Sequence, residues 1–194
     1  MWSNGELSID HLQGYSLEYF HLVKVVPELV NNIRLKLGDS KLRSIVEETQ
    51  KEEESHIEPW IRFASSLGVK KKDLLNHVYD ENTKEAVSSL VSLTENSLDE
   101  AVCAMYAYEM DLPNISRSKL EGLDKFYNLS TSDSRNYFEI HQEADIRHAA
   151  MWRNMITKIP DHKNESCIDS AVKSLNAQNL LLDAVYEKYV KPFN

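Results

Sequence analysis

Apolar side chains recur along this chain at spacings of three and four residues, which is the period of an α-helix. The first such segment covers residues 9–37, and its repeating apolar positions are Leu12, Tyr15, Tyr19, Leu22, Val26, Leu29 and Ile33. Further helical segments are predicted at residues 41–67, 71–96, 97–110, 115–127, 134–159 and 164–189. No stretch of the sequence shows the alternation typical of a β-strand. The pattern therefore predicts an all-α protein built as a helical bundle.

Glycine and proline interrupt this pattern at few places. The chain has five of each, and several of them, such as Gly38, Gly68, Pro113 and Pro160, lie where a helical segment ends. Gly68 is predicted to end the second segment, and either Asp80 or Asn82 to begin a helix within residues 71–96. Two prolines fall inside predicted helices. We expect Pro27 to kink the first helix or to split it in two, and Pro59 to bend the second.

The composition is that of a globular protein, with 42% hydrophobic and 27% charged residues in a length of 194. This length favours a single domain over residues 1–194. No apolar run approaches the roughly 18 residues of a membrane span, and the first residues have no secretory pattern, so we expect a cytoplasmic protein without a membrane partner. The net charge of -9 disfavours nucleic acid, which is itself a polyanion. Cys103 and Cys167 are expected to be reduced and buried.

The strongest candidate chemistry lies in residues 138–152, FEIHQEADIRHAAMW. A rotation of about 100° per residue places His141, Asp145 and His148 on one helix face. Tyr137 lies one turn before them on this face, and Trp152 one turn after. Burying three ionisable groups without partners would cost several kcal/mol each, and a bound cation removes that cost. A metal site is therefore favoured over a hydrogen-bonded polar cluster.

Two other helical segments offer ligands of the same kind. Glu53 and His56 have the E-x-x-H spacing with which bundle helices bind paired iron or manganese ions. Read alone, this acidic stretch is more typical of a solvated helix face. Glu109 ends an apolar helix, where it is either a ligand or an exposed terminal glutamate. The six residues together offer carboxylate and imidazole but no thiolate, which favours two iron or manganese ions over one structural zinc.

At these residues the chain resembles the heme-oxygenase-like di-iron oxidases, relatives of the TenA and PqqC proteins. The likeness covers nearly the whole chain and lies in GELSIDHLQGYSLEYFHLVKVVPELV, HIEPWIRFASSLGV, YAYEMDLPNISRSKLEGL and YFEIHQEADIRHAAMW. It implies a bundle of about seven helices that binds no heme but two iron ions, with a Mn/Fe pair as the alternative. It also implies dioxygen and an external reductant as co-reactants, a small-molecule or self-derived substrate, and a homodimer.

The resemblance also implies a set of metal ligands, namely His56, Glu109, His141, Asp145, His148 and one glutamate of the segment 41–67. Many relatives carry that glutamate seven residues before the histidine, where this chain has Thr49. Others carry it three residues before, as Glu53 is here. Glu53 is therefore the expected sixth ligand, with Glu48 and Glu52 in reserve.

Within this family the chain is most similar to the subgroup of the chlamydial protein associating with death domains, which makes 4-aminobenzoate for folate. In that subgroup a tyrosine of the protein itself is consumed and a lysine supplies nitrogen. Lys119 matches the lysine, and Tyr108 and Tyr137 match tyrosines near the metals, so these three are the candidate catalytic residues. Read from the residues alone, Lys119 is also typical of a solvated helix position and the tyrosines of core packing. The chain begins about one helix later than most relatives, so a tyrosine carried on that helix is expected to be absent.

Two other functions stay open. A TenA-like thiamin-pyrimidine hydrolase needs no metal and uses a nucleophilic cysteine. Cys103 lies in the segment expected for that role. It does not follow a proline, however, and so lacks the proline-cysteine motif that the resemblance associates with this activity. A non-catalytic interaction module would use the polar stripe as a structural network and the acidic surface to dock a partner.

Overall fold

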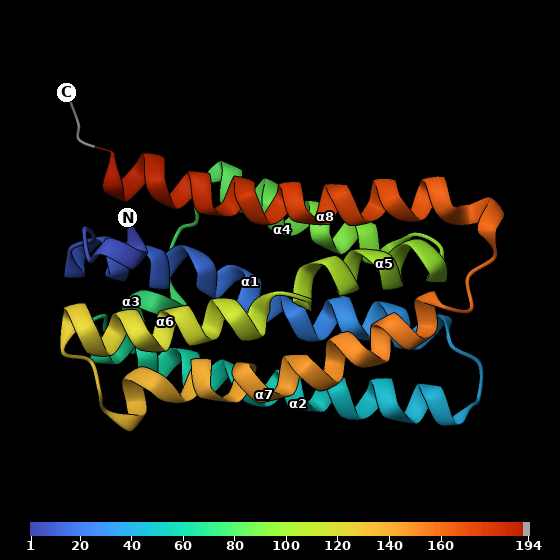
Figure 1. Cartoon of the computed structure of the whole chain (residues 1–194). Helices are drawn as coiled ribbons and strands as arrows, with labels where there is room; N and C mark the ends of the chain where they lie inside the picture. The colour runs from blue at the N-terminus through green and yellow to red at the C-terminus, as the bar shows by residue number, and fades with distance from the viewer. Residues whose placement is uncertain (192–194) are drawn as a thin grey trace.

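The computed structural model describes residues 1–191, and these form eight α-helices (Figure 1). The long helices are α1 (Ile9–Lys36), α2 (Lys41–Ser66), α4 (Glu81–Glu95), α5 (Leu98–Glu109), α6 (Leu112–Tyr127), α7 (Ser132–Ile156) and α8 (Asn164–Val185). The remaining one, α3 (Lys71–Leu75), has only five residues. The same part of the chain includes the short elements η1 (Trp2–Asn4), η2 (Asp161–Lys163) and the π-helical η3 (Tyr186–Val190). The all-α class and a bundle of about seven helices are confirmed.

Prolines lie inside helices without ending them. α1 runs unbroken through Pro27, so of the two expected alternatives, a kink or a split, the split does not occur. α2 likewise continues through Pro59. Each proline removes one intrahelical hydrogen bond. Both are buried, and tertiary packing of a helix compensates for such a local loss. Pro113 lies in the first turn of α6, where its missing N–H has no helical partner to lose, so α6 begins at Leu112 and not at residue 115.

Most of the long helices begin at a side chain that accepts a hydrogen bond from the first turn. These capping residues are Ser8, Ser40, Asp80, Ser97 and Thr131. Such caps satisfy backbone N–H groups that have no partner inside the helix. Of the two candidates for the start of α4, Asp80 is the cap and Asn82 donates its backbone N–H to it.

The helices surround two apolar clusters. In Figure 1, α2 and α7 lie along one side of the bundle, α4 and α8 along the other, and α1, α5 and α6 between them. One cluster includes Leu29 and Met105 and extends to Trp152 of α7, and the other includes Trp60 and extends to Phe138 of α7. The middle of α7 therefore lies between the two clusters, and this is where its polar stripe falls.

Two further expectations concern the chain as a whole. No helix within residues 1–191 is both long and apolar enough to cross a bilayer. Cys103 of α5 and Cys167 of α8 are both buried and form no disulfide, as predicted.

Candidate metal centre

Six side chains with metal-binding groups meet where α2, α5 and α7 face one another. They are Glu53 and His56 from α2, Glu109 from α5, and His141, Asp145 and His148 from α7. None of the six is more than 6% exposed. The structure thus brings together all six residues that the sequence singled out, and their role as metal ligands stays a prediction. We call them the α2–α5–α7 cluster.

Two histidines of α7 are oriented by hydrogen bonds that point away from the cluster. His141 donates its Nδ1–H to the Tyr137 carbonyl at 2.9 Å, and the Tyr137 ring stacks on the imidazole with centroids 4.2 Å apart. His148 donates from Nε2 to Glu52 Oε2 at 3.0 Å. The His56 ring lies 4.5 Å from that of His141. One nitrogen of each α7 imidazole is thereby fixed as a donor, which leaves Nε2 of His141 and Nδ1 of His148 for the interior.

Glu53 connects the α2 side of the cluster to the α7 side. His148 Nδ1 lies 3.1 Å from Glu53 Oε1 and 3.6 Å from Asp145 Oδ1. The distance from the same nitrogen to Glu109 Oε2 is 4.0 Å. The second oxygen of Glu53, Oε2, accepts a hydrogen bond from His56 Nδ1 at 3.2 Å. The Glu53 carboxylate therefore contacts an imidazole on each side.

Two carboxylate oxygens of the cluster are buried without a partner among the described residues. Trp152 donates its indole N–H to Glu109 Oε2 at 2.6 Å, but Glu109 Oε1 has no hydrogen-bond partner among the described residues. Asp145 Oδ2 is in the same situation, whereas His148 Nδ1 faces the Glu53 carboxylate described above. A buried polar group without a partner costs about 1–3 kcal/mol. Two such carboxylate oxygens in one cluster fit a site that a cation completes.

Electrostatics point in the same direction. Burial raises the pKa of Glu109 well above its ordinary value, and Asp145 and Glu53 add to this rise while His148 opposes it. Burial also disfavours the charged forms of Glu53 and His148. The attraction between the Glu53 carboxylate and the protonated His148 imidazole favours these forms more strongly. The pKa of Glu53 lies well below its ordinary value, and that of His148 rises to about 11. A divalent cation would offset the same carboxylates and take the place of the His148 proton.

The donor set fits two ions better than one. Two groups of three residues each place candidate ligand atoms within 4.8 Å of one another. They are Glu53, His56 and His141, and Glu53, Glu109 and His148. Glu53 belongs to both groups, and Asp145 adjoins the second one through His148. Carboxylate and imidazole without thiolate suit iron or manganese.

The structure separates the glutamates of α2 that the sequence left as alternatives. Glu48 is exposed, and Glu52 lies at the rim, where it binds His148 and pairs with Arg147 at 2.6 Å. Thr49 is buried and directs its hydroxyl toward Met151. Only Glu53 of these candidates lies inside the cluster. The support that Glu52 and Arg147 give to His148 escaped the sequence analysis, because a contact between residues 52 and 147 leaves no local pattern.

The two candidate tyrosines lie beside the cluster. Tyr137 stacks on His141, as described above. Tyr108 is buried on α5 and directly precedes Glu109, the last residue of this helix. Burial raises the pKa of Tyr108 well above its ordinary value, with smaller contributions from neighbouring phenols and from Glu53 and Asp145. Both phenols therefore stay protonated near neutral pH.

Lys119 lies in a separate place on α6. Its Nζ is 4.1 Å from the Trp2 ring centroid and 4.8 Å from that of Tyr15, beside a cavity of about 190 Å³ that Tyr15 and Lys119 both line. Burial lowers the pKa of Lys119 to about 8. Tyr15 packs on Trp60, with centroids 5.6 Å apart, and Trp60 packs on Tyr137 at 4.6 Å. A row of aromatic rings thus leads from Lys119 to the cluster. The sequence marked Tyr15, a member of this row, only as an apolar position of the first helix.

The cysteine required by a TenA-like hydrolase is poorly suited to nucleophilic attack. Cys103 is buried, and burial raises the pKa of its thiol to about 12, with Cys167 acting in the same direction. The thiolate is the reactive form of cysteine, and its population at neutral pH is negligible at such a pKa. The burial of Cys103 therefore disfavours this alternative.

A helical bundle with a buried carboxylate and histidine cluster between three helices is the architecture of metal-dependent redox proteins. The sequence profile of the iron-containing redox enzymes matches residues 13–179, and the chain belongs to this family. It is similar to the 4-aminobenzoate synthase of Chlamydia trachomatis serovar D, with 31% identity over 190 residues. The matched region is 95% of this chain and 79% of that relative.

Solved structures share the fold. A domain of unknown function with a heme oxygenase-like fold from Shewanella denitrificans OS217 has a TM-score of 0.81 and 19% identity, over 97% of this chain and 82% of that one. A TenA homologue from Pseudomonas syringae pv. tomato has a TM-score of 0.80 and 14% identity, over 96% and 83% of the two chains. These matches show that the fold is heme oxygenase-like, as the resemblance in sequence implied.

Proposed function

We propose that this protein is a non-heme oxidase with two metal ions, either Fe/Fe or Mn/Fe, that activates dioxygen and produces 4-aminobenzoate. The observation that carries the metal-dependent part is the buried cluster in which Glu109 Oε1 and Asp145 Oδ2 lack partners within the described residues. The product is proposed from the similarity to a relative named 4-aminobenzoate synthase.

The six residues of the cluster divide into those that would hold each ion. The first ion would be held by Glu53, His56 and His141, and the second by Glu53, Glu109 and His148 with Asp145 beside them. Bound there, the metals supply one-electron exchange with dioxygen, which amino-acid side chains do not provide. The protein supplies the ligand positions, and the shared Glu53 keeps the two positions close.

Other side chains of the chain keep the ligands in place and the centre dry. The Tyr137 carbonyl holds the Nδ1–H of His141, and the Trp152 N–H holds one oxygen of Glu109. Such supporting hydrogen bonds fix the tautomer and the orientation of a ligand. Because all six cluster residues are buried, bulk water is largely excluded, which strengthens the electrostatic interactions inside.

We further propose that the substrate is self-derived, with nitrogen from Lys119 and the ring from a tyrosine of the chain. A pKa of about 8 gives Lys119 a neutral amine fraction near physiological pH that an ordinary lysine lacks. Tyr15 packs against this amine, and Tyr137 packs against His141. These contacts support a phenol and an amine as reaction partners inside the same chain.

The metal-dependent part is tested by iron content and oxygen uptake. His141→Ala should bind iron at least about tenfold more weakly, because the variant loses the imidazole ligand that the Tyr137 carbonyl orients. The matched control is His162→Ala, since His162 is exposed on η2, and it should keep the iron content of the unmodified chain. Equal iron in the two variants, measured by plasma emission spectrometry, would remove His141 from the ligand set.

The self-derived substrate is tested by isotope labelling. Protein produced with ¹⁵N-lysine, purified and supplied with iron, reductant and air, should release ¹⁵N-labelled 4-aminobenzoate, at no more than one molecule per chain. Lys119→Arg should abolish this product without changing bound iron. Lys125→Arg, a substitution at an exposed site on the same helix, is the control. Unlabelled product, or full product from Lys119→Arg, would rule out Lys119 as the donor.

A further inference from the structure

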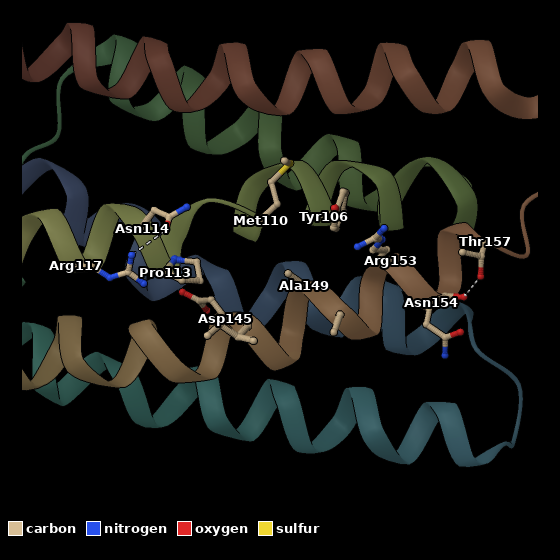
Figure 2. A pocket seen from close by; sticks show the side chains of 12 residues that line it. Tyr106, Met110, Pro113, Asn114, Arg117, Asp145, Ala149, Arg153, Asn154 and Thr157 are labelled. Atoms are coloured by element: carbon tan, nitrogen blue, oxygen red, sulfur yellow. Dashed lines mark hydrogen bonds between the residues drawn. The ribbon is translucent and has the colours of Figure 1, made fainter.

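A groove of about 580 Å³ opens between α7 and the junction of α5 with α6 (Figure 2). We call it the α6–α7 groove, and the side chains that define it here are Met110, Pro113, Arg117, Asp145, Ala149 and Arg153. Asp145 lines the groove and is also a member of the α2–α5–α7 cluster. Its Oδ2 atom is buried without a partner among the described residues. The groove therefore adjoins the candidate metal centre at Asp145.

Two arginines of the groove lack a carboxylate partner. Arg153 forms no hydrogen bond or ion pair with any side chain of residues 1–191, and Arg117 has only a 3.5 Å contact with the Asn114 amide oxygen. By contrast, Arg135 and Arg147 are each paired with a glutamate. In a chain with a net charge of -9, unpaired guanidinium groups at one cavity favour an anionic ligand. The planar guanidinium matches a carboxylate with two parallel hydrogen bonds.

The groove between these arginines suits a flat apolar group. Met110 and Pro113 line the groove on the side of α5 and α6, and Ala149 is a small residue on the facing side of α7 (Figure 2). Asp145, Ala149 and Arg153 follow one another at successive turns of α7, so the groove extends roughly 12 Å along the helix axis from the cluster to Arg153. This length accommodates one aromatic ring with a substituent at each end, and a methionine sulfur packs well against such a ring.

We infer that the α6–α7 groove binds an aromatic carboxylate and is the path by which 4-aminobenzoate leaves the centre. The carboxylate pairs with Arg153, the ring lies against Met110 and Pro113, and the amine faces Asp145. Arg117 adds positive potential at the same groove. This inference rests on the proposed function, because the identity of the product comes from it.

Calorimetric titration of the purified, iron-loaded chain tests the groove, with 4-aminobenzoate, benzoate and aniline as probes. We expect benzoate to bind about as well as 4-aminobenzoate, and aniline at least tenfold more weakly because it lacks the carboxylate. Arg153→Gln should raise the Kd of 4-aminobenzoate about tenfold or more while leaving that of aniline unchanged. Arg62→Gln is the control, since Arg62 lies on α2 away from the groove, and it should bind as the unmodified chain does.

A second variant tests the groove by shape. Ala149→Phe should fill the space opposite Met110 and abolish binding of all three probes, while its iron content and thermal unfolding stay those of the unmodified chain. Equal affinity for aniline and 4-aminobenzoate, or an unchanged Kd in Arg153→Gln, would overturn the inference. A third outcome would also overturn the inference. If carboxylate-selective binding is lost when a chelator removes iron but is kept in Arg153→Gln, the metals and not Arg153 hold the carboxylate.

The two proposals can fail separately. Iron-dependent formation of 4-aminobenzoate without carboxylate-selective binding would overturn the groove and leave the proposed function in place. Carboxylate-selective binding that depends on Arg153, in a chain that forms no product, would support the ligand class of the groove and overturn the proposed function. Measuring iron, product and Kd on the same preparation distinguishes these outcomes.

Discussion

Trp152 shows how a single residue can govern the candidate centre without being a ligand. Its indole N–H donates a hydrogen bond to Glu109 Oε2, and the other oxygen of this carboxylate has no partner among the described residues. The carboxylate of Glu109 is buried and would otherwise be free to turn within the cluster. The bond to Trp152 therefore fixes the rotation of the Glu109 carboxylate and leaves its other oxygen available to a metal ion.

Replacing Trp152 by Phe removes this bond and retains most of the aromatic volume. We expect iron affinity to fall about 10–100-fold, which is the usual effect of losing a supporting hydrogen bond to a metal ligand. Competition of the apo-protein with a coloured chelator for ferrous iron measures the change.

Trp60→Phe is the control for this variant. Trp60 is equally buried and donates its N–H to the Ser16 carbonyl, away from the six cluster residues. It should lose similar stability without a change in iron affinity. A Trp152→Phe protein that binds iron as tightly as Trp60→Phe would show that Glu109 needs no such support.

At the scale of elements, the end of the described chain packs closely on its beginning. η3 follows α8 and lies against α1, where the Tyr189 ring covers Gly14. A Cβ atom added at Gly14 would come within 2.3 Å of that ring. The glycine is therefore retained in the middle of a helix, where it costs about 1 kcal/mol relative to alanine, because it lets η3 approach.

Gly14→Ala should consequently destabilise the protein, although alanine favours the helix. Overpacking costs about 1–3 kcal/mol, which exceeds the gain in helix propensity, and Tyr189 must move away from α1. Urea denaturation measures the loss, and hydrogen exchange at residues 186–190 locates it. Gly38→Ala is the matched control, because nothing lies within 4 Å of its added Cβ. A gain in stability for Gly14→Ala would contradict the close packing of η3.

At the scale of the whole molecule, one buried carboxylate joins parts of the chain that are far apart in sequence. Glu18 of α1 is fully buried and accepts hydrogen bonds from Lys188 at 2.6 Å and from His77 at 2.9 Å. The backbone N–H of Asp80 and the hydroxyl of Tyr189 also donate to it, at 3.0 and 3.2 Å. Burial alone would raise the pKa of Glu18, but these donors outweigh it and lower the pKa to about 2.

This shift predicts how stability depends on pH. The pKa of Glu18 is lower in the folded state than its ordinary 4.5, so its contribution is complete above about pH 4.5 and is lost as the pH falls toward 2. Glu18→Gln should lower the free energy of unfolding by about 2 kcal/mol at pH 7, as expected for hydrogen bonds to a charged group. The difference from the unmodified chain should shrink steadily between pH 4.5 and pH 2.

Denaturation with urea at a series of pH values measures this difference. Glu187→Gln is the control, since Glu187 is exposed and its pair with Lys191 is solvated, and exposed pairs contribute little. A difference between Glu18→Gln and the unmodified chain that is the same at pH 7 and pH 3 would show that Glu18 acts through packing and not through its charge.

The sequence by itself determined the features that depend on neighbours within a few turns. The three-and-four spacing of apolar residues predicted the helices, and Asp80, one of two candidates, marked the start of α4. The spacing of His141, Asp145 and His148 put three ligand groups on one face of α7, because the helix period is a local property. The sequence left a kink and a split at Pro27 as alternatives, and packing keeps α1 continuous through it.

The tertiary structure decided which faces meet. It selected Glu53 over Glu48 and Glu52 as the α2 member of the cluster, since a helix with several neighbouring glutamates leaves the choice to the rotation at which it packs on α7. It alone joined Trp152 to Glu109 and placed Arg153 in a groove that reaches Asp145. Such contacts depend on how whole helices pack around two apolar clusters, and the local periodicity of the sequence carries no record of them.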